Sequence, residues 1–184
     1  MAVAKKPAVA KPKAKAAPKT APSKLKGDGL SINTSVDGSA REKVAEALTK
    51  AVADSYTLYV KTLGVHWNVQ GANFYGLHKL TDGQYNELHQ AADEIAERIR
   101  ALGHYAPGTY REYSKLSSIA EPESVPEALE MVRLLVSANE SVAKTARSAF
   151  EKADAANDQP TADLLTQRLD VHEKNAWMLR SLLQ

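Results

Sequence analysis

The spacing of apolar residues restricts the fold of this chain more than any other feature of its sequence. After about residue 35, apolar side chains recur every three or four residues through four long stretches, and no long stretch alternates with period two. This spacing is typical of amphipathic helices and not of half-buried strands. The low content of Gly and Phe, nine and two residues, also argues against a sandwich or barrel. The sequence therefore predicts an all-α protein.

Capping residues and breakers divide this pattern into separate helices. Ser39 and Ser124 are each followed three residues later by Glu, which is the spacing of a capping box at a helix start. Asn73 is a further candidate cap after the break at Gly71, and Pro160 suits the first turn of a last helix, where its missing N–H does no harm. The predicted long helices span about 40–68 and 74–102, a stretch opened by Ser124, and a stretch that carries Pro160 near its start.

A long connection separates the second and third predicted helices. Residues 103–122 hold Gly, Pro and Ser, and a short helix over about 110–116 fits inside them. Four long helices with one long crossover predict a bundle of the crossover type, rather than an up-down-up-down bundle with short loops. A chain of 184 residues is expected to form one domain, and the bundle would occupy residues 35–184.

The N-terminal region differs in composition from the rest of the chain. Residues 1–26 carry eight lysines and no acid, whereas the remaining residues hold 16 Lys or Arg and 22 Asp or Glu, a net charge of −6. Residues 1–34 contain half of the prolines and no aromatic residue, so they are predicted to form a disordered arm. Such an arm suits sequence-independent contact with phosphates, and a solubilising tail is the alternative. The candidate DNA-binding residues are Lys5, Lys6, Lys11, Lys13, Lys15, Lys19, Lys24 and Lys26.

Two absences from the sequence exclude whole classes of function. The chain has no cysteine, which excludes disulfide scaffolds, thiolate zinc or iron–sulfur sites and cysteine nucleophiles. No apolar run approaches the roughly 18 residues that a membrane helix needs, so no membrane partner is expected.

Four potential metal ligands share one face of the second predicted helix. His78, Asp82, Asp93 and Glu97 fall within about 100° around the helix axis, but His78 and Asp93 are about 22 Å apart along it. One straight helix therefore cannot bring all four to one ion. The two pairs are symmetric about a point between residues 87 and 88. An antiparallel copy of the helix across a two-fold axis would place each His78–Asp82 pair level with the other chain's Asp93 and Glu97.

A fifth candidate ligand, His66, lies near the end of the first predicted helix and can approach His78 across the intervening turn. Each of two equivalent sites would then offer two imidazoles and three carboxylates, a set that suits Fe(II), with Zn(II) and Mn(II) as competitors. The alternative is a solvated helix face on which His78 and Asp82 form an ordinary pair one turn apart. No Glu has a His three residues later, so the Glu-x-x-His motif of a di-iron site inside one subunit is missing.

Three sequence motifs contain all five of these residues. They are His66-Trp67-Asn68-Val69-Gln70-Gly71-Ala72-Asn73-Phe74, Leu77-His78-x-x-x-Asp82 and Asp93-Glu94-Ile95-Ala96-Glu97-Arg98. In this order and spacing they resemble the Dps family, the DNA-binding proteins from starved cells, also called mini-ferritins. The resemblance covers about residues 40–184 and implies a ferritin-like four-helix bundle whose long crossover carries the short helix.

The resemblance also implies a function. It implies a hollow shell of twelve subunits with a ferroxidase site at the dimer interface, where His66, His78 and Asp82 come from one subunit and Asp93 and Glu97 from its partner. These five residues would be both catalytic and metal-binding, and each site would hold two irons and no haem. The implied activity is oxidation of Fe(II), preferably by hydrogen peroxide, with storage of ferric mineral inside the shell.

The resemblance extends to partners and location. It implies a cytoplasmic, nucleoid-associated protein that binds double-stranded DNA without sequence preference through its lysine arm and protects DNA from oxidative damage. The alternative function is a purely architectural protein that compacts the nucleoid and whose metal site is idle.

Other positions carry narrower expectations. The resemblance suggests that Trp67 is an electron donor beside the site, and the alternative is a packing aromatic. It also suggests that Asp154, Asp158 and Asp163 line three-fold pores through which iron enters, although Asp158 would also suit a helix cap. Thr81 departs from the usual family pattern and is expected to touch no ligand.

The remaining histidines and one tyrosine are expected to have structural roles. His172 lies on an apolar stripe and is predicted to be a hydrogen-bonded core residue, whereas His104 is predicted in a solvated loop. Tyr85 and His89 lie near the predicted two-fold axis and are expected to pack at that interface.

Overall fold

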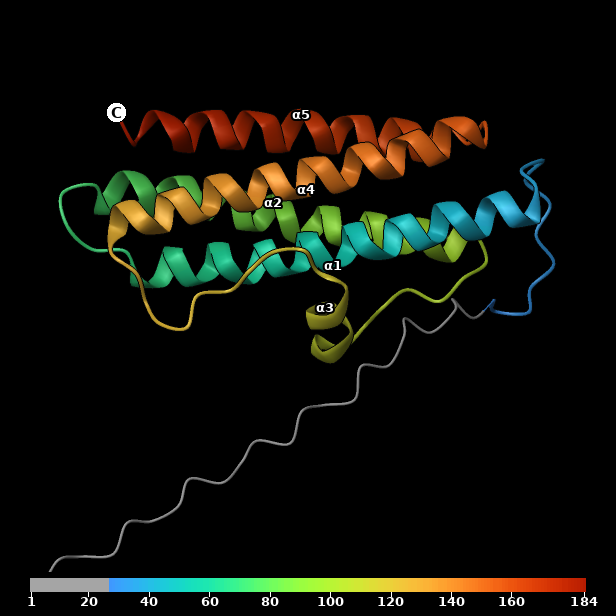
Figure 1. Cartoon of the computed structure of the whole chain (residues 1–184), viewed down its shortest axis with the longest axis horizontal. Coiled ribbons are helices and arrows are strands. Elements are labelled where there is room, and N and C mark those ends of the chain that lie inside the picture. The colour runs from blue at the N-terminus through green and yellow to red at the C-terminus, as the bar shows by residue number, and fades with distance from the viewer. Residues whose placement is uncertain (1–26) are drawn as a thin grey trace, which may run out of the picture.

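A computed structural model of the chain describes residues 27–184, and within them the regular secondary structure is helical. Four long helices run side by side, and a short helix lies outside the bundle against the first of them (Figure 1). The second helix packs on the first and the last two pack on each other. The helices are α1 (Gly38–Asn68), α2 (Phe74–Ala101), α3 (Tyr110–Leu116), α4 (Ala128–Ala155) and α5 (Gln159–Ser181). This is the predicted bundle with its long crossover and short helix.

The predicted helix starts were right to within a few residues, but two of the predicted caps were wrong. The cap of α1 is Asp37, whose side chain accepts hydrogen bonds from the backbone of Ser39 and Ala40 at 2.8 and 3.2 Å. Ser124 does not open α4, which begins only after Glu127. The reason is Pro126, which disfavours helical backbone at the residue before it and so prevents a start at Ser124.

The other two predicted starts agree better with the structure. Pro160 lies in the first turn of α5, as predicted, and Asp158 caps this helix by accepting a hydrogen bond from the Thr161 amide. Asn73 occupies the cap position of α2, but its side chain makes no capping hydrogen bond. Gly71, with a φ of +96°, makes the sharp turn between α1 and α2, a conformation that glycine adopts without strain.

The apolar core has two parts along the length of the bundle. One is built around Leu48, Ile99 and Leu165, and the other around Leu88 and Leu135, and all five side chains are buried. Side chains of this size contribute roughly 1.5–3 kcal/mol each when fully buried. Burial of the apolar side chains along one face of each long helix therefore stabilises the bundle.

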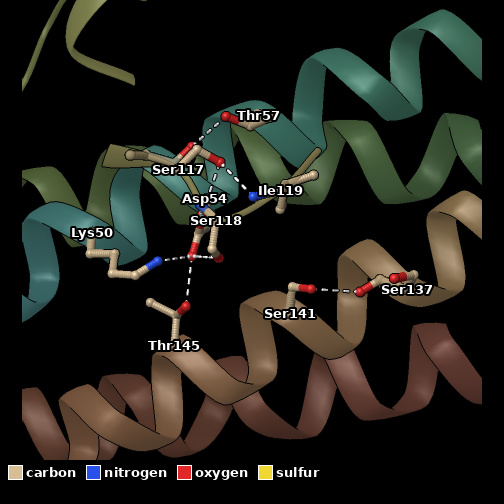
Figure 2. Close-up of polar contacts among 10 residues, drawn as sticks. Lys50, Asp54, Thr57, Ser117, Ser118, Ile119, Ser137, Ser141 and Thr145 are labelled. Carbon is tan, nitrogen blue, oxygen red and sulfur yellow. Dashed lines mark hydrogen bonds and ion pairs between the residues drawn. The ribbon is translucent and has the colours of Figure 1, made fainter. Parts of the chain in front are cut away.

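The long α3–α4 connection is held to the bundle by a buried carboxylate, Asp54 (Figure 2). Asp54 on α1 accepts hydrogen bonds from the Ser118 amide at 2.5 Å, the Ser117 hydroxyl at 3.0 Å and the Thr145 hydroxyl of α4 at 2.6 Å. Lys50 forms an ion pair with it at 3.1 Å. Burial alone would raise the pKa of Asp54, but the hydrogen bonds outweigh burial and hold its pKa below the ordinary value.

The described chain begins with a segment anchored to the bundle. Gly27 forms an isolated β-bridge with His104, the Asp28 amide donates to the Gly103 carbonyl at 3.0 Å, and the Asp28 carboxylate pairs with Arg100 at 3.1 Å. The predicted end of the arm at residue 34 is therefore too late, because contacts with the body begin by residue 27. The lysines of the arm, in residues 1–26, lie outside the described residues.

The start of α1, the end of α2 and the α4–α5 turn lie at the same end of the bundle (Figure 1). Among the helices of residues 27–184, none is long and apolar enough to cross a membrane.

Candidate metal centre

Two histidines face each other across the α1–α2 turn. His66 lies in the last turn of α1 and His78 in the second turn of α2, and their rings stack with centroids 3.8 Å apart and planes 18° from parallel. The Nδ1 atom of each ring is 2.9 Å from the backbone carbonyl oxygen of the other residue. A carbonyl oxygen only accepts, so both Nδ1 atoms carry the proton, and each Nε2 keeps a lone pair for a metal ion.

This reciprocal pairing fixes both ring orientation and tautomer. Neutral imidazole is the form that binds metal, and hydrogen bonding of its other nitrogen raises its basicity as a ligand. Thr81 adds to the arrangement, since its hydroxyl oxygen lies 3.3 Å from His66 Nδ1 and donates to the Leu77 carbonyl at 2.8 Å. The expectation that Thr81 would touch no ligand residue was therefore wrong.

A carboxylate and a phenol lie next to the histidine pair. Asp82 follows His78 by one helical turn, and its Oδ1 accepts a hydrogen bond from the Tyr85 hydroxyl at 2.9 Å. The Tyr85 ring meets the His66 ring edge to face, with centroids 5.1 Å apart. The hydrogen bond to Asp82 raises the pKa of Tyr85 above its ordinary value. Tyr85 was expected only to pack at the two-fold interface, and its contact with His66 could not be predicted from sequence because it depends on how α1 and α2 pack together.

The two remaining predicted ligands lie elsewhere on the chain. Asp93 and Glu97 are exposed on later turns of α2. Within residues 27–184 of one chain, no three His, Asp or Glu side chains are close enough together to hold a metal ion. The fold thus brings together His66 and His78, and does not bring Asp93 and Glu97 to them within one chain.

The other predicted site residues occupy varied environments. Trp67 is 70% exposed beside His66, and Asp154 and Asp163 are exposed on either side of the α4–α5 turn. Asp158 is buried, where it caps α5 and forms an ion pair with Arg98 at 2.6 Å. Its carboxylate is occupied by these contacts, so we withdraw Asp158 from the candidate pore residues.

The histidines outside the site differ from one another. His89 is exposed and tilts against Tyr59, whereas His104 is half-buried, not solvated as predicted. His172 is a core residue whose Nδ1 lies 3.0 Å from the Asn139 side-chain oxygen. Its Nε2 is buried and has no hydrogen-bond partner among the described residues, so the prediction of a fully hydrogen-bonded histidine was only half right. Burial and the nearby Arg168 lower the pKa of His172 to about 3.

Comparison with known proteins decides the family. A family model described as a ferritin-like domain matches residues 45–184. "DNA protection during starvation protein 2" of Bacillus anthracis is 37% identical over 142 residues, which cover 77% of this chain and 97% of that protein. The chain belongs to the Dps family.

Solved structures of Dps proteins have the same fold. The Dps protein of Bacillus brevis aligns with a TM-score of 0.77 and 33% identity over 83% of this chain and 100% of that chain. The Dps protein of Vibrio cholerae O1, described as a member of a superfamily of ferritin-like diiron-carboxylate proteins, aligns with a TM-score of 0.79 and 28% identity over 85% of this chain and 99% of that chain. This Dps chain therefore has the ferritin-like bundle expected from its sequence.

Proposed function

We propose that this Dps protein oxidises Fe(II) at sites shared between two subunits and stores the ferric product in a hollow shell. The observation that carries the proposal is the reciprocal hydrogen bonding of His66 and His78, which leaves two Nε2 lone pairs free on neighbouring rings. Membership of a superfamily that includes a ferritin-like diiron-carboxylate Dps protein supports iron as the metal.

The proposed site is completed by a two-fold axis. His66, His78 and Asp82 of one subunit would meet Asp93 and Glu97 of the partner subunit, because the two sets are symmetric about the middle of α2. The imidazoles would supply neutral donors, and the carboxylates would neutralise the charge of two irons. Two Fe(II) held together can pass two electrons to one hydrogen peroxide, which yields water and avoids release of hydroxyl radical.

We also propose that the lysine arm binds duplex DNA without sequence preference, so that the shell protects DNA from iron and peroxide. The eight lysines of residues 1–26 supply the charge for phosphate contacts. The anchor at Gly27 and Asp28 supports a defined point of departure for the arm. The name of the Bacillus anthracis relative, a DNA protection protein, supports the same role.

Mixed shells test whether sites are shared. Two variants, His66→Ala/His78→Ala and Asp93→Ala/Glu97→Ala, are each expected to lose peroxide-dependent Fe(II) oxidation in pure shells. In a heterodimer of the two, one site regains the full set of ligands, while the other keeps only Asp82. Co-assembled shells should therefore recover part of the activity.

Two controls make this experiment decisive. Shells of the two variants mixed only after assembly should stay inactive, and native mass spectrometry should verify heterodimers in the co-assembled sample. If verified heterodimers recover no activity, the five ligands do not form a site between subunits.

A further inference from the structure

Five of the seven tyrosines form a continuous row of ring contacts. Starting beside the histidine pair, the centroid of Tyr85 is 6.4 Å from that of Tyr59, which is 5.6 Å from that of Tyr56. Tyr56 stacks on Tyr113 of α3 at 4.7 Å and meets Tyr110 edge to face at 6.4 Å. Aromatic rings at these separations are in direct contact. The row therefore runs from α2 across α1 to α3 without a gap.

The two ends of the row lie in different surroundings. At the inner end, Tyr85 meets the His66 ring at 5.1 Å and donates its hydroxyl hydrogen to Asp82. At the outer end, Tyr110 is 76% exposed. A hollow of about 440 Å³ lies beside Tyr56, Tyr110 and Tyr113 on the surface of the described chain. The row thus connects the candidate iron site with the surface at α3.

Packing alone does not require this composition. Phenylalanine or leucine would fill the same α1–α3 contact, yet every member of the row is a phenol. A phenol gives up one electron and its hydroxyl proton more readily than aliphatic side chains or a phenyl ring. Electrons pass easily between rings in contact, so a row of phenols conducts oxidising equivalents over a distance that a single residue cannot span.

The geometry points to a tyrosine relay, Tyr85–Tyr59–Tyr56–Tyr113/Tyr110, that delivers an electron to the iron site from the surface at α3. This inference rests on the proposed iron oxidation. When a site holds only one Fe(II), hydrogen peroxide takes one electron from that iron and one from Tyr85. The Tyr85 hydroxyl proton and one proton from solvent complete the reduction of peroxide to two waters.

The remaining steps restore the protein. Tyr85, left as a neutral radical, is reduced by an electron and a proton from Tyr59. Tyr59 in turn takes an electron and a proton from Tyr56. The hole exchanges among the phenols of the row and is removed at Tyr113 or Tyr110, where a small soluble one-electron reductant such as ascorbate returns the hydrogen atom. The relay would protect the histidine ligands from oxidation, because a site that holds only one Fe(II) would no longer release hydroxyl radical beside them.

The substitution Tyr59→Phe interrupts the relay and keeps the ring that packs against its neighbours. Shells are loaded with one Fe(II) per histidine pair and one hydrogen peroxide, without a reductant. Tyrosyl radical is followed by freeze-quench EPR, and oxidised residues are located by peptide mass spectrometry. In the unmodified protein, oxidation should appear on Tyr110 and Tyr113. In Tyr59→Phe it should fall several-fold there and increase on Tyr85 and His66.

A matched control is Tyr105→Phe. Tyr105 is exposed and lies against Arg100, outside the row. This variant should show the oxidation pattern of the unmodified protein. Equal oxidation of Tyr110 and Tyr113 in the unmodified protein and in Tyr59→Phe would overturn the relay, as would normal Fe(II) oxidation without any tyrosyl radical.

An iron-free measurement separates the relay from the proposed function. The chain has no cysteine, so Ser114→Cys on α3 gives one attachment point for a photo-oxidant beside Tyr110 and Tyr113. After a flash, oxidation should reach Tyr85, and Tyr59→Phe should prevent this. Transfer to Tyr85 without Fe(II) oxidation would refute the proposed function and leave the relay standing. Fe(II) oxidation without transfer would refute the relay alone.

Discussion

Replacement of Asp54 should change how the stability of the protein depends on pH. Its pKa is held below the ordinary value, so its contribution is fully present above the unfolded-state pKa of about 3.9 and is lost as the pH falls through the lower folded-state pKa. The donors around it come from three parts of the chain: Lys50, the Ser117–Ser118 segment and Thr145.

We expect Asp54→Asn to destabilise the protein near neutral pH by about 1–3 kcal/mol, because an amide group faces donors and leaves a buried group unsatisfied. The difference from the unmodified protein should shrink below about pH 4, where the carboxyl of the unfolded chain takes up a proton before the native carboxyl does, and it should vanish once the pH falls through the lower pKa of the native carboxyl. Denaturant midpoints measured from pH 7 to pH 3 test both parts. Asp170→Asn, an exposed change on α5, should leave the midpoints unaltered. A constant difference at all pH values would contradict the assignment.

At the level of single residues, sequence gave the identity of candidate ligands but not their arrangement. The helical period alone placed His78 and Asp82 on one face. The crossed hydrogen bonds of His66 and His78 depend on how two helix ends pack together, and so does the contact of the Tyr85 ring of α2 with the His66 ring of α1. Asp54 had no signal at all, since a lone Asp on an apolar stripe does not show which donors will surround it.

At the level of elements, apolar spacing predicted the helices and their approximate bounds because burial of one stripe per helix is what forms the bundle. The capping residues were harder to predict, because several residues near each helix start could accept the capping hydrogen bond. Pro126 delayed the start of α4, and Asp37 capped α1 in place of Ser39. Asp158 was recognised from sequence both as a pore candidate and as a possible cap, and the structure shows the cap together with a buried ion pair to Arg98 that the sequence did not indicate.

The α4–α5 turn presents two exposed acids to the surface. Asp154 and Asp163 remain exposed on its two sides, so we expect Asp154→Asn/Asp163→Asn to slow iron uptake at low ionic strength, because the local attraction for cations falls. Stopped-flow uptake at limiting Fe(II) measures this, while oxidation at saturating iron should persist.

A pair of exposed acids elsewhere serves as the control for this variant. Glu121→Gln/Glu123→Gln removes the same charge from the connection before α4 and should leave uptake unchanged. If the two double variants slow uptake equally, the effect comes from net charge and not from the α4–α5 turn.

At the level of the whole molecule, the sequence and the fold divide the protein into two oppositely charged parts. The basic region is residues 1–26, and the described part of the chain begins with a contact to the body at Gly27. The body carries a net charge of −6 and is expected to repel DNA on its own. The two-fold symmetric ligand set stays a prediction, which could be made because residue spacing on a straight helix converts directly into position. The contacts of Gly27 and Asp28 with the body could not be predicted, because they depend on how the end of α2 packs.

Deletion of residues 1–26 should therefore abolish DNA binding and leave iron chemistry intact. The truncation preserves the contacts of Gly27 and Asp28 and all five candidate ligands, so the shell should assemble and oxidise Fe(II) at its normal rate. A single arm offers at most eight phosphate contacts, but many arms on one shell raise the effective concentration of each after the first has bound. Full-length shells should retard duplex DNA in gels in a steeply salt-dependent way, and truncated shells should not.

A full-length variant with all eight arm lysines replaced by Gln separates charge from length. It should behave as the truncation does, since neutral side chains release no counterions from DNA. Retained gel retardation by both variants would locate the DNA surface on the body and reduce the arm to a solubilising tail. DNA binding by the unmodified protein without peroxide-dependent iron oxidation would instead favour a purely architectural role, because the arm would then act while the histidine pair stays idle.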